Sequence, residues 1–334
     1  MQPVFSTTPP ARHNSLPSLR VAEMRKKVGA LPPSEWQRAV RMRDPVTLLK
    51  RTHPHVNRAT FKMHELVARL FRDARAPSNA VFLAEAPGGF LYCARRVWPR
   101  CECTAMSSLA PGAIGFIDEA DPSLLHDLPH HSDLLHPEVI DAIVDRCGAA
   151  SIEFVSADGG IEVPDLDAAE QHSTLLVLAQ AAAALEVQAC GGSLVLKIFE
   201  GCTLVTRELF EILRALYTKI MLFKPLSSKA SNSERYVVGV GLRSPQAARS
   251  TARGLRAAIE RCRGAAPPLF VVSLGVHVPA ATHDAFDQMA AEQAAAIDAL
   301  HGRVQSGQLA DLRATAATDA KRVEALFGEY EKCI

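Results

Sequence analysis

The segment VFLAEAPGGF, residues 81–90, constrains the fold more than any other part of the chain. Its apolar first half is typical of a buried parallel strand, and a Pro-Gly-Gly turn leads from it into an amphipathic helix predicted over residues 91–97. In an open α/β sheet, ligands bind beyond the carboxyl ends of the strands, where glycine allows close approach to the backbone. Gly88 and Gly89 therefore indicate a cofactor-binding turn or an ordinary strand-to-helix turn, because two glycines lack the longer phosphate-binding pattern.

Strand and helix patterns alternate through the middle of the chain. Further strands are predicted at residues 102–106, 151–156, 193–199, 219–223 and 234–242. Helices are predicted at residues 34–43, 58–72, 137–147, 168–188 and 206–217, the fourth of which should end at glycines 191 and 192. Because the polar loop before the last strand is too short for a crossover helix, the last strand pairing should be antiparallel. The pattern predicts an α/β fold with a mostly parallel sheet and one reversed strand.

The two ends of the chain differ in composition from this middle part. Residues 1–48 are basic, and the repeated Pro, Ser and Thr of residues 1–32 predict a partly flexible extension. Residues 49–245 carry the α/β pattern, and residues 246–334 are Ala-rich and predict a helical extension. In that last part, helices are predicted at residues 245–263, 282–304 and 309–332, with a short apolar run at residues 269–274.

Charge is unevenly distributed along the chain. Residues 1–62 hold 12 Lys or Arg against 3 acidic residues, residues 63–244 hold 15 against 23, and the remainder holds 10 against 10. A basic segment of this kind suits a polyanion such as RNA, although basic N-termini are also often simply solvated.

Composition argues against several other classes of protein. Hydrophobic content of 48% and charged content of 22% are ordinary for a globular protein, and no apolar run reaches the roughly 18 to 20 residues that span a bilayer. We therefore expect an intracellular protein with no membrane association. The closest cysteines, Cys101 and Cys103, lack metal-site spacing, and the loop histidines, His53, His55 and the pair 130–131, favour solvated or structural roles, so no metal is expected.

Four ionisable residues stand out as candidates for chemistry. Asp158 follows the strand at residues 151–156, Glu234 opens the last strand, and Lys62 lies near the start of a helix that leads into the sheet. Lys197 lies in an otherwise apolar strand, where burial of its charge is costly unless carboxylates lie beside it. A structural salt bridge and a catalytic role are both consistent with that position.

These four positions match the Lys-Asp-Lys-Glu tetrad of the FtsJ-like RNA ribose 2′-O-methyltransferases, which the chain resembles over about residues 50–245. The resemblance is strongest to the eukaryotic and large-DNA-virus enzymes that methylate the first nucleotides after an mRNA cap. It rests on Asn57-Arg58-Ala59, Lys62-Met63, EAPGGF at 85–90, Asp133 to Glu138, ADGG at 157–160, GGSLVLKIFEG at 191–201 and KPLSSKASNSERYVV at 224–238.

The resemblance implies a fold, a cofactor and a substrate. The fold would be the Rossmann-like methyltransferase fold, a mostly parallel seven-stranded sheet with one antiparallel strand. S-Adenosylmethionine would be the methyl donor and RNA, specifically the capped 5′ end of mRNA, the acceptor. Lys62, Asp158, Lys197 and Glu234 would form the catalytic tetrad, with Lys197 acting at the 2′-hydroxyl as a base or as an electrostatic stabiliser, without a metal.

The resemblance also assigns residues to cofactor binding. These residues are Asn57, Glu85, Pro87, Gly88, Gly89, Phe90, Asp133 and Asp158, with Asp133 directed to the adenosine. Many methyltransferases end the second strand with an acid that binds the cofactor ribose, whereas Met106, Ser107 and Ser108 occupy that region here. The group that binds the ribose therefore stays open.

Two other functions remain open at this stage. The same fold could methylate ribosomal or transfer RNA, or it could bind RNA without catalysis. The resemblance further implies a nuclear or cytoplasmic location in a eukaryotic cell, or association with a virus. The C-terminal helices are a possible contact for a protein partner.

Overall fold

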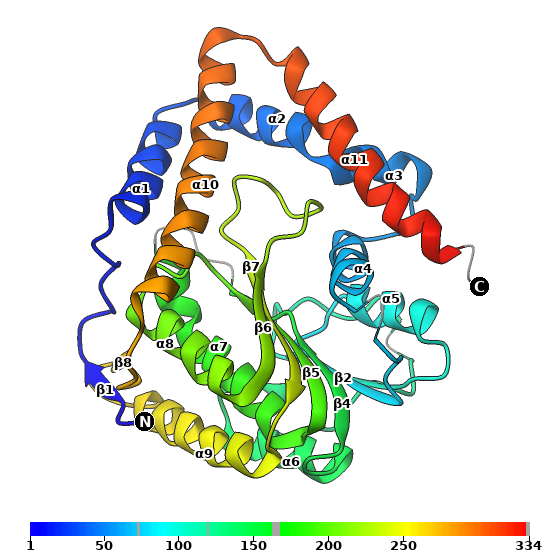
Figure 1. The fold of residues 1–334 in the computed structure, drawn as a ribbon, viewed down its shortest axis with the longest axis vertical. Helices are drawn as coiled ribbons and strands as arrows, with labels where there is room; N and C mark the ends of the chain where they lie inside the picture. Colours follow the sequence, from blue (N-terminus) through cyan, green and yellow to red (C-terminus); the bar gives the residue numbers. More distant parts are fainter. Residues whose placement is uncertain (72–73, 119, 162–167, 332–334) are drawn as a thin grey trace.

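The computed structural model describes residues 1–71, 74–118, 120–161 and 168–331. Its centre is a six-stranded sheet in the order β3-β2-β4-β5-β7-β6 (Figure 1). The strands are β2 (Asn79–Leu83), β3 (Glu102–Ala105), β4 (Ile152–Ala157), β5 (Gln188–Ile198), β6 (Tyr217–Phe223) and β7 (Arg235–Leu242). Strands β3, β2, β4 and β5 pair in parallel, and β7 is antiparallel to both of its neighbours. The predicted mostly parallel sheet with one reversed strand is confirmed.

The number of strands differs from the expected seven. Beyond β3, the described residues contribute only a single parallel bridge between Ala105 and Leu124. The intervening segment includes SSLAPGAIGF, residues 107–116, whose proline and glycines disfavour a regular strand at that edge.

Helices cover both faces of the sheet. The larger apolar core lies beneath α6 (Pro137–Cys147), α7 (Ala169–Val187), α8 (Leu204–Leu216) and α9 (Pro245–Cys262). On the other face, α4 (Arg58–Leu70) and α5 (Gly89–Val97) enclose a second core that includes Phe82 and Phe154. Helix α7 is buried along most of its length, which explains why its sequence is rich in alanine and lacks a polar face.

Strand β5 begins earlier than the sequence suggested. Helix α7 ends at Val187, and Gln188 is already extended, so Gly191 and Gly192 lie within β5 and do not terminate the helix. Gly191 adopts a φ of 78°, and the pairing of β4 with β5 shifts register between Ile152 and Phe154. The glycines therefore accommodate a bulge in the strand.

The N-terminal and C-terminal segments pack together. Strand β1 (Val4–Ser6) pairs antiparallel with β8 (Phe270–Ser273), and α1 (Leu16–Gly29) packs along α10 (Ala280–Ser306). Figure 1 shows α10, α11 (Ala310–Glu331), α2 (Pro33–Arg43) and α3 (Pro45–Thr52) framing the loop between β6 and β7. Residues 1–32, whose composition suggested a flexible extension, contain β1 and α1. The side chains of Val21 and Met24 pack with Ala290, Ala294 and Ile297 of α10.

Part of the positive charge of the N-terminal segment is neutralised within the protein. Arg12 and Arg25 both form ion pairs with the buried carboxylate of Glu200, and Arg43 pairs with Asp319 at 2.8 Å. These arginines connect the N-terminal segment to the sheet and to α11. None of the described helices is long and apolar enough to cross a membrane.

Phe286 offers a test of whether α10 belongs to the cooperative core. Its ring is fully buried and lies against Gly201, where any Cβ would overlap it. Phe286→Ala should lower the free energy of unfolding by about 3 to 5 kcal/mol in urea titrations, because it leaves a cavity.

Gln288→Ala, on the exposed side of the same helix, is the matched control and should change stability by no more than about 0.5 kcal/mol. A loss below about 1 kcal/mol for Phe286→Ala would show that α10 is not part of that core.

Candidate active site

The four candidate residues meet at the carboxyl edge of the sheet. Asp158 follows β4, and Lys197 is the penultimate residue of β5. Because β5 and β7 are antiparallel, the end of β5 lies beside the start of β7, where Glu234 directly precedes the strand. Helix α4 brings Lys62 to the same place from the face of the sheet.

Two ion pairs connect these residues. The Lys62 Nζ lies 2.7 Å from Glu234 Oε1, and the Lys197 Nζ lies 3.4 Å from Asp158 Oδ1. Lys197 also donates a hydrogen bond to the main-chain oxygen of Asp158 at 2.6 Å. All four side chains are at most 14% exposed, so each charge is compensated by a neighbour in a poorly solvated place.

The charges of the two lysines act on Glu234. Burial alone would raise the pKa of this carboxyl, but the positive charges of Lys62 and Lys197 outweigh burial. With the hydrogen bond from Lys62 and the charge of Lys224, they lower the pKa of Glu234 to about 2. Glu234 is therefore a carboxylate at neutral pH, and Lys197 is close enough to influence it.

Three further polar groups support the tetrad positions and were missed from sequence. The Tyr236 hydroxyl donates to Asp158 Oδ1 at 2.8 Å, and the Ser228 hydroxyl donates to Glu234 Oε1 at 3.1 Å. The Lys224 ammonium donates to the main-chain oxygens of Asn232 and Glu234. Tyr236 could have been found, since it lies two residues after Glu234 and pairs directly with Lys197 across the strands.

Lys224 has an unusual environment. Burial lowers its pKa to about 7, the positive charges of Arg235 and Lys62 act in the same direction, and Glu234 opposes them. A third lysine beside the two ion pairs thus carries a charge that changes near neutral pH.

A cleft of about 750 Å³ opens directly in front of these residues. Asp158, Lys197 and Glu234 line one part of it, and Asp133 lines another. The rest of the wall comes from the segments after β2 and β3, from nearby loops and from α7: Ala84, Ala86, Met106, Ser107, Ser108, Gly112, Ala113, Ile114, Ser132, Leu134, Gly159, Gly160, Ile161, Leu176, Phe199 and Asn232.

The glycines after β2 have a structural role besides the predicted contact with a cofactor. A Cβ at Gly89 would overlap the side chains of Asn57 and Ala59, so this glycine permits α5 to pack against the start of α4. The Asn57 Oδ1 caps α4 by accepting from the Thr60 N–H at 2.9 Å. Gly88 caps α5 in the left-handed region, with a φ of 103°. Their contact with a cofactor stays a prediction, since none of them lines the cleft.

Glu85 supports the same turn from within. Its buried carboxyl accepts hydrogen bonds from the N–H groups of Phe90 and Leu91 at 2.7 and 2.9 Å. Burial raises its pKa to about 8, and the negative charge of Asp158 adds to this, although the two N–H donors favour the ionised form. Glu85, Pro87 and Phe90 shape the turn beside the cleft and do not line it.

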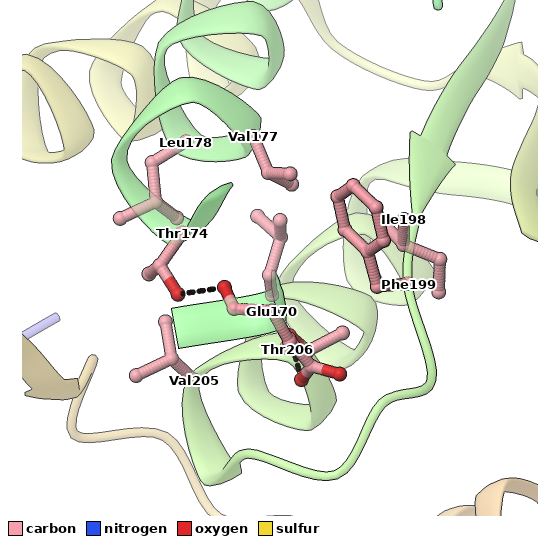
Figure 2. Close-up of a pocket in the computed structure, with 9 residues that line it drawn as sticks. Glu170, Thr174, Val177, Leu178, Ile198, Phe199, Val205 and Thr206 are labelled. Carbon is pink, nitrogen blue, oxygen red and sulfur yellow. Dashed lines mark hydrogen bonds between the residues drawn. The ribbon is translucent and has the colours of Figure 1, made fainter. Parts of the chain in front are cut away.

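The loop after β5 is held by a buried carboxylate of α7. Glu170 accepts hydrogen bonds from the main-chain N–H groups of residues 201–203 and from the hydroxyls of Thr203 and Thr206. Figure 2 shows Glu170 between Thr174 and Thr206 at a cavity of about 10 Å³, which is no larger than a water molecule needs. Glu170 therefore holds the loop that follows Lys197, and this cavity has no room for a substrate.

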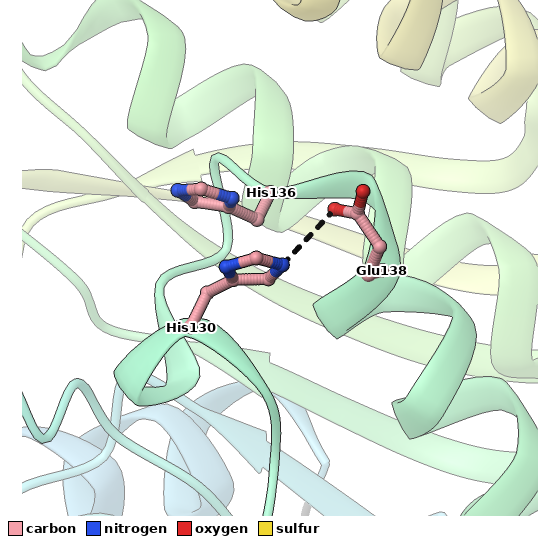
Figure 3. A group of neighbouring side chains, drawn as sticks. All are labelled: His130, His136 and Glu138. Atoms are coloured by element: carbon pink, nitrogen blue, oxygen red, sulfur yellow. Dashed lines mark ion pairs between the residues drawn. The ribbon is translucent and has the colours of Figure 1, made fainter.

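A histidine cluster lies on both sides of Asp133 in the sequence. The rings of His130 and His136 stack with centroids 4.0 Å apart and planes 17° from parallel, and His130 Nε2 lies 3.7 Å from Glu138 Oε2 (Figure 3). The donor atoms of the three residues lie within 4.8 Å of one another. Nitrogen lone pairs lie in the ring plane, so those of two nearly parallel rings run side by side instead of converging on one ion. We therefore assign this cluster a structural role.

The sheet, its reversed strand and the cleft at its carboxyl edge define a Rossmann-like methyltransferase. The model of the FtsJ-like methyltransferase family matches residues 55–242, and the chain belongs to that family. S-Adenosylmethionine is the methyl donor of these enzymes.

Relatives that match the chain in sequence are named as mRNA methyltransferases. Over 246 residues, the chain is 26% identical to cap-specific mRNA (nucleoside-2′-O-)-methyltransferase 2 of Drosophila melanogaster, an alignment that covers 64% of this chain and 35% of the relative. It is 36% identical over 116 residues to cap-specific mRNA (nucleoside-2′-O-)-methyltransferase 1 of Mus musculus, covering 33% of this chain and 14% of the relative. The chain thus spans about a third or less of these curated relatives.

A similar solved structure is a crystal structure of a protein named as a ribosomal RNA methyltransferase of Plasmodium falciparum. It is 15% identical in sequence, has a TM-score of 0.42 and covers 56% of this chain and 98% of that one.

The residues of the cleft fit S-adenosylmethionine. A volume of about 750 Å³ is within the usual range for small-molecule sites, about 300 to 1,000 Å³. Asp133 and Asp158 offer carboxylates to a positively charged donor, and Leu134 offers an apolar surface. The buried hydroxyl of Ser132 also lines the cleft and has no hydrogen-bond partner among the described residues, which leaves it available to a ligand.

The raised pKa of Glu85 predicts a change of stability with pH. Between its ordinary value of 4.5 and about 8, the unfolded chain releases a proton that the folded protein keeps, so wild-type stability falls as pH rises through this window. Glu85→Gln keeps an oxygen acceptor for both N–H groups and does not titrate. In urea titrations from about pH 5 to pH 8, the free energy of unfolding of the variant should rise relative to that of wild type by up to about 1.4 kcal/mol per pH unit.

Glu260→Gln, at an exposed position on α9, is the control and should follow wild type. If Glu85→Gln instead loses stability relative to wild type as pH rises, Glu85 is ionised in the folded protein.

Proposed function

We propose that this protein transfers a methyl group from S-adenosylmethionine to the ribose 2′-hydroxyl of a cap-proximal mRNA nucleotide. The observation that carries the proposal is the meeting of Lys62, Asp158, Lys197 and Glu234 in two ion pairs at the rim of the cleft. Family membership supports methyl transfer, and the names of the relatives support a capped RNA acceptor.

The proposed chemistry makes few demands on the protein. S-Adenosylmethionine supplies a methyl group on a positively charged sulfur. The protein must align the acceptor hydroxyl with that methyl group, and it must accept the hydroxyl proton or stabilise the negative charge that develops on the oxygen. Two lysines and two carboxylates in a poorly solvated place suit this task, because electrostatic interactions are stronger there than in water.

Within the tetrad, we assign Lys197 to the acceptor hydroxyl. It is the lysine that lines the cleft, and Asp158 holds its ammonium from the side chain and from the main chain. Glu234 and Lys62 form the second pair, which balances charge and fixes the start of β7. In this arrangement Lys197 serves either as the base or as the cation that stabilises the developing alkoxide.

The cofactor would be held by two sets of residues. Asp133 and Asp158 line the cleft and would contact S-adenosylmethionine directly, with Ser132 nearby. The remaining candidates, Asn57, Glu85, Pro87, Gly88, Gly89 and Phe90, would act by fixing the turn after β2. Ser107 and Ser108 line the cleft after β3 and are candidates for the ribose.

The N-terminal segment would contribute less to RNA binding than its net charge suggests. Arg12 and Arg25 are engaged by Glu200, whereas the exposed Arg38, Arg41 and Lys50 of α2 and α3 have no ion-pair partner among the described residues. We include in the proposal a protein contact on the exposed faces of α10 and α11.

Methyl transfer to matched short RNAs, one capped and one uncapped, tests the proposal. The wild-type protein should methylate the capped RNA at the ribose and the uncapped RNA weakly. Lys197→Ala should lower the rate by about 10² to 10⁴-fold, because it removes the group at the acceptor hydroxyl. Mass spectrometry of the digested RNA would locate the methyl group.

Lys219→Ala is the matched control, since Lys219 is an exposed lysine on the outer strand β6. Equal methylation of both RNAs would favour ribosomal or transfer RNA as substrate. Absence of S-adenosylmethionine binding in calorimetry would instead favour a non-catalytic RNA-binding protein.

A further inference from the structure

Gln180 is a buried amide in the middle of α7, and the tetrad does not include it. The side chain is fully buried, in a run of the helix that is otherwise Val, Leu and Ala. A buried polar side chain in such surroundings is costly unless its hydrogen bonds are made. Its partners therefore indicate why an amide occurs at this position.

Both ends of the amide are satisfied. The Gln180 Oε1 accepts a hydrogen bond from the Gly159 N–H at 2.7 Å, and the Nε2 donates to the main-chain oxygen of Leu176 at 3.3 Å. This orientation of the amide is required, because a main-chain N–H needs an acceptor and a carbonyl needs a donor.

The Gly159 N–H belongs to the peptide unit whose carbonyl belongs to Asp158. That carbonyl accepts the hydrogen bond from the Lys197 Nζ at 2.6 Å. In a planar trans peptide the N–H and C=O point in opposite directions, so fixing one fixes the other. Gln180 and Lys197 thus hold the two edges of a single peptide plane.

The packing around this peptide is equally restrictive. A Cβ at Gly159 would lie 2.6 Å from Gln180 Oε1 and 2.8 Å from the Ala84 Cβ, so the amide is pressed directly against the turn. A Cβ at Gly160 would lie 3.0 Å from the Lys197 Nζ. The lack of a side chain at Gly159 thus makes room for Gln180, and the lack of one at Gly160 makes room for Lys197.

We propose that Gln180 is a positioning residue for Lys197 and acts through the peptide unit between Asp158 and Gly159. The amide oxygen fixes the plane of that peptide and directs its carbonyl at the ammonium. An N–H that donates a hydrogen bond also makes the carbonyl of the same peptide a better acceptor. Gln180 therefore both places Lys197 and stabilises its charged form.

Loss of the hydrogen bond between Gln180 and Gly159 should make the charged form of Lys197 less stable. Without it the carbonyl is a poorer and less well-directed acceptor, so the charged form of Lys197 loses part of its stabilisation. This direction is the same whether Lys197 acts as a base or as a cation. The other charged or titratable groups around Lys197 are Asp158 after β4, Lys224, Glu234 and Tyr236 of the β6–β7 hairpin, and Lys62 of α4.

Gln180→Met tests the inference, since methionine is similar in size and offers only a weak acceptor. The readout is the titration midpoint of the Lys197 Cε resonance in the full chain labelled with [¹³Cε]lysine, assigned with Lys197→Arg. The midpoint should be lower than that of wild type, because the charged form of Lys197 loses part of its stabilisation. An unchanged midpoint in the folded variant would overturn the inference.

Ser173→Ala is the matched control. Ser173 is fully buried on the same side of α7, two turns before Gln180, and its hydroxyl has no partner among the described residues. This variant should leave the Lys197 midpoint unchanged, which separates the proposed effect from general loosening of α7. A midpoint lowered equally in both variants would count against the inference.

Gln180→Glu provides rescue, because it keeps an acceptor oxygen opposite the Gly159 N–H. Its Lys197 midpoint should equal or exceed that of wild type, and a lower midpoint would overturn the inference. If Gln180→Met does not fold, the Lys197 midpoint of Gln180→Glu alone tests the inference.

The catalytic consequence rests on the proposed function, whereas the titration does not. If the wild type methylates RNA, Gln180→Met should lower kcat by up to about 10²-fold, with little change in KM for S-adenosylmethionine. If the wild type is inactive, the proposed function fails while the titration still decides the role of Gln180.

Discussion

The arrangement of the site depends on compensating four buried charges at one edge of a sheet. An unpaired ammonium or carboxylate in this place would be strongly disfavoured by desolvation. Pairing Lys62 with Glu234 and Lys197 with Asp158 removes most of that penalty, and this pairing requires β4, β5, β7 and α4 to end at one point. The reversed strand β7 meets this requirement, because it brings a residue before its start beside a residue at the end of β5.

The loops around these charges are fixed by main-chain hydrogen bonds to buried side chains. Glu170 holds the loop after β5, Glu65 accepts from the N–H groups of Leu226 and Ser227 in the loop before β7, and Glu85 holds the turn after β2. In each case a carboxyl group from a helix or turn accepts from main-chain N–H groups that would otherwise lack a partner. The positions of the catalytic candidates are therefore set by side chains outside the tetrad, and Gln180 belongs to the same pattern.

The central fold could be predicted from local patterns, and these patterns together with the family resemblance singled out the four ionisable residues that the structure brings together. The apolar strands, the glycine turn after β2 and the polar residues at strand ends can all be recognised within short windows, and α6 was predicted with its observed bounds. Helix α3 was missed although Asp44 and Pro45 form a recognisable start, with Asp44 accepting from the Val46 N–H.

Long-range contacts could not be predicted in this way. The ion pair of Arg12 with Glu200 joins residues 188 positions apart, and the basic composition of the N-terminal segment suggested solvent or RNA instead. The pairing of β1 with β8 and the insertion of Gln180 against Gly159 likewise depend on partners that no local pattern identifies. For the same reason, the packing role of Gly89, where a Cβ would overlap the side chains of Asn57 and Ala59, could not be predicted from the sequence.

The docking of the two chain ends has a consequence for how a minimal enzyme is defined. Glu200 follows Lys197 by three residues, and Arg235 follows Glu234 directly and bonds Gln293 and the Met289 carbonyl of α10. A fragment cut at the family boundaries, residues 55–242, would remove both arginines that pair with Glu200 and the α10 acceptors of Arg235, close in sequence to Lys197 and Glu234. The folded unit that surrounds these four residues therefore extends beyond the matched family region and includes α1 and α10.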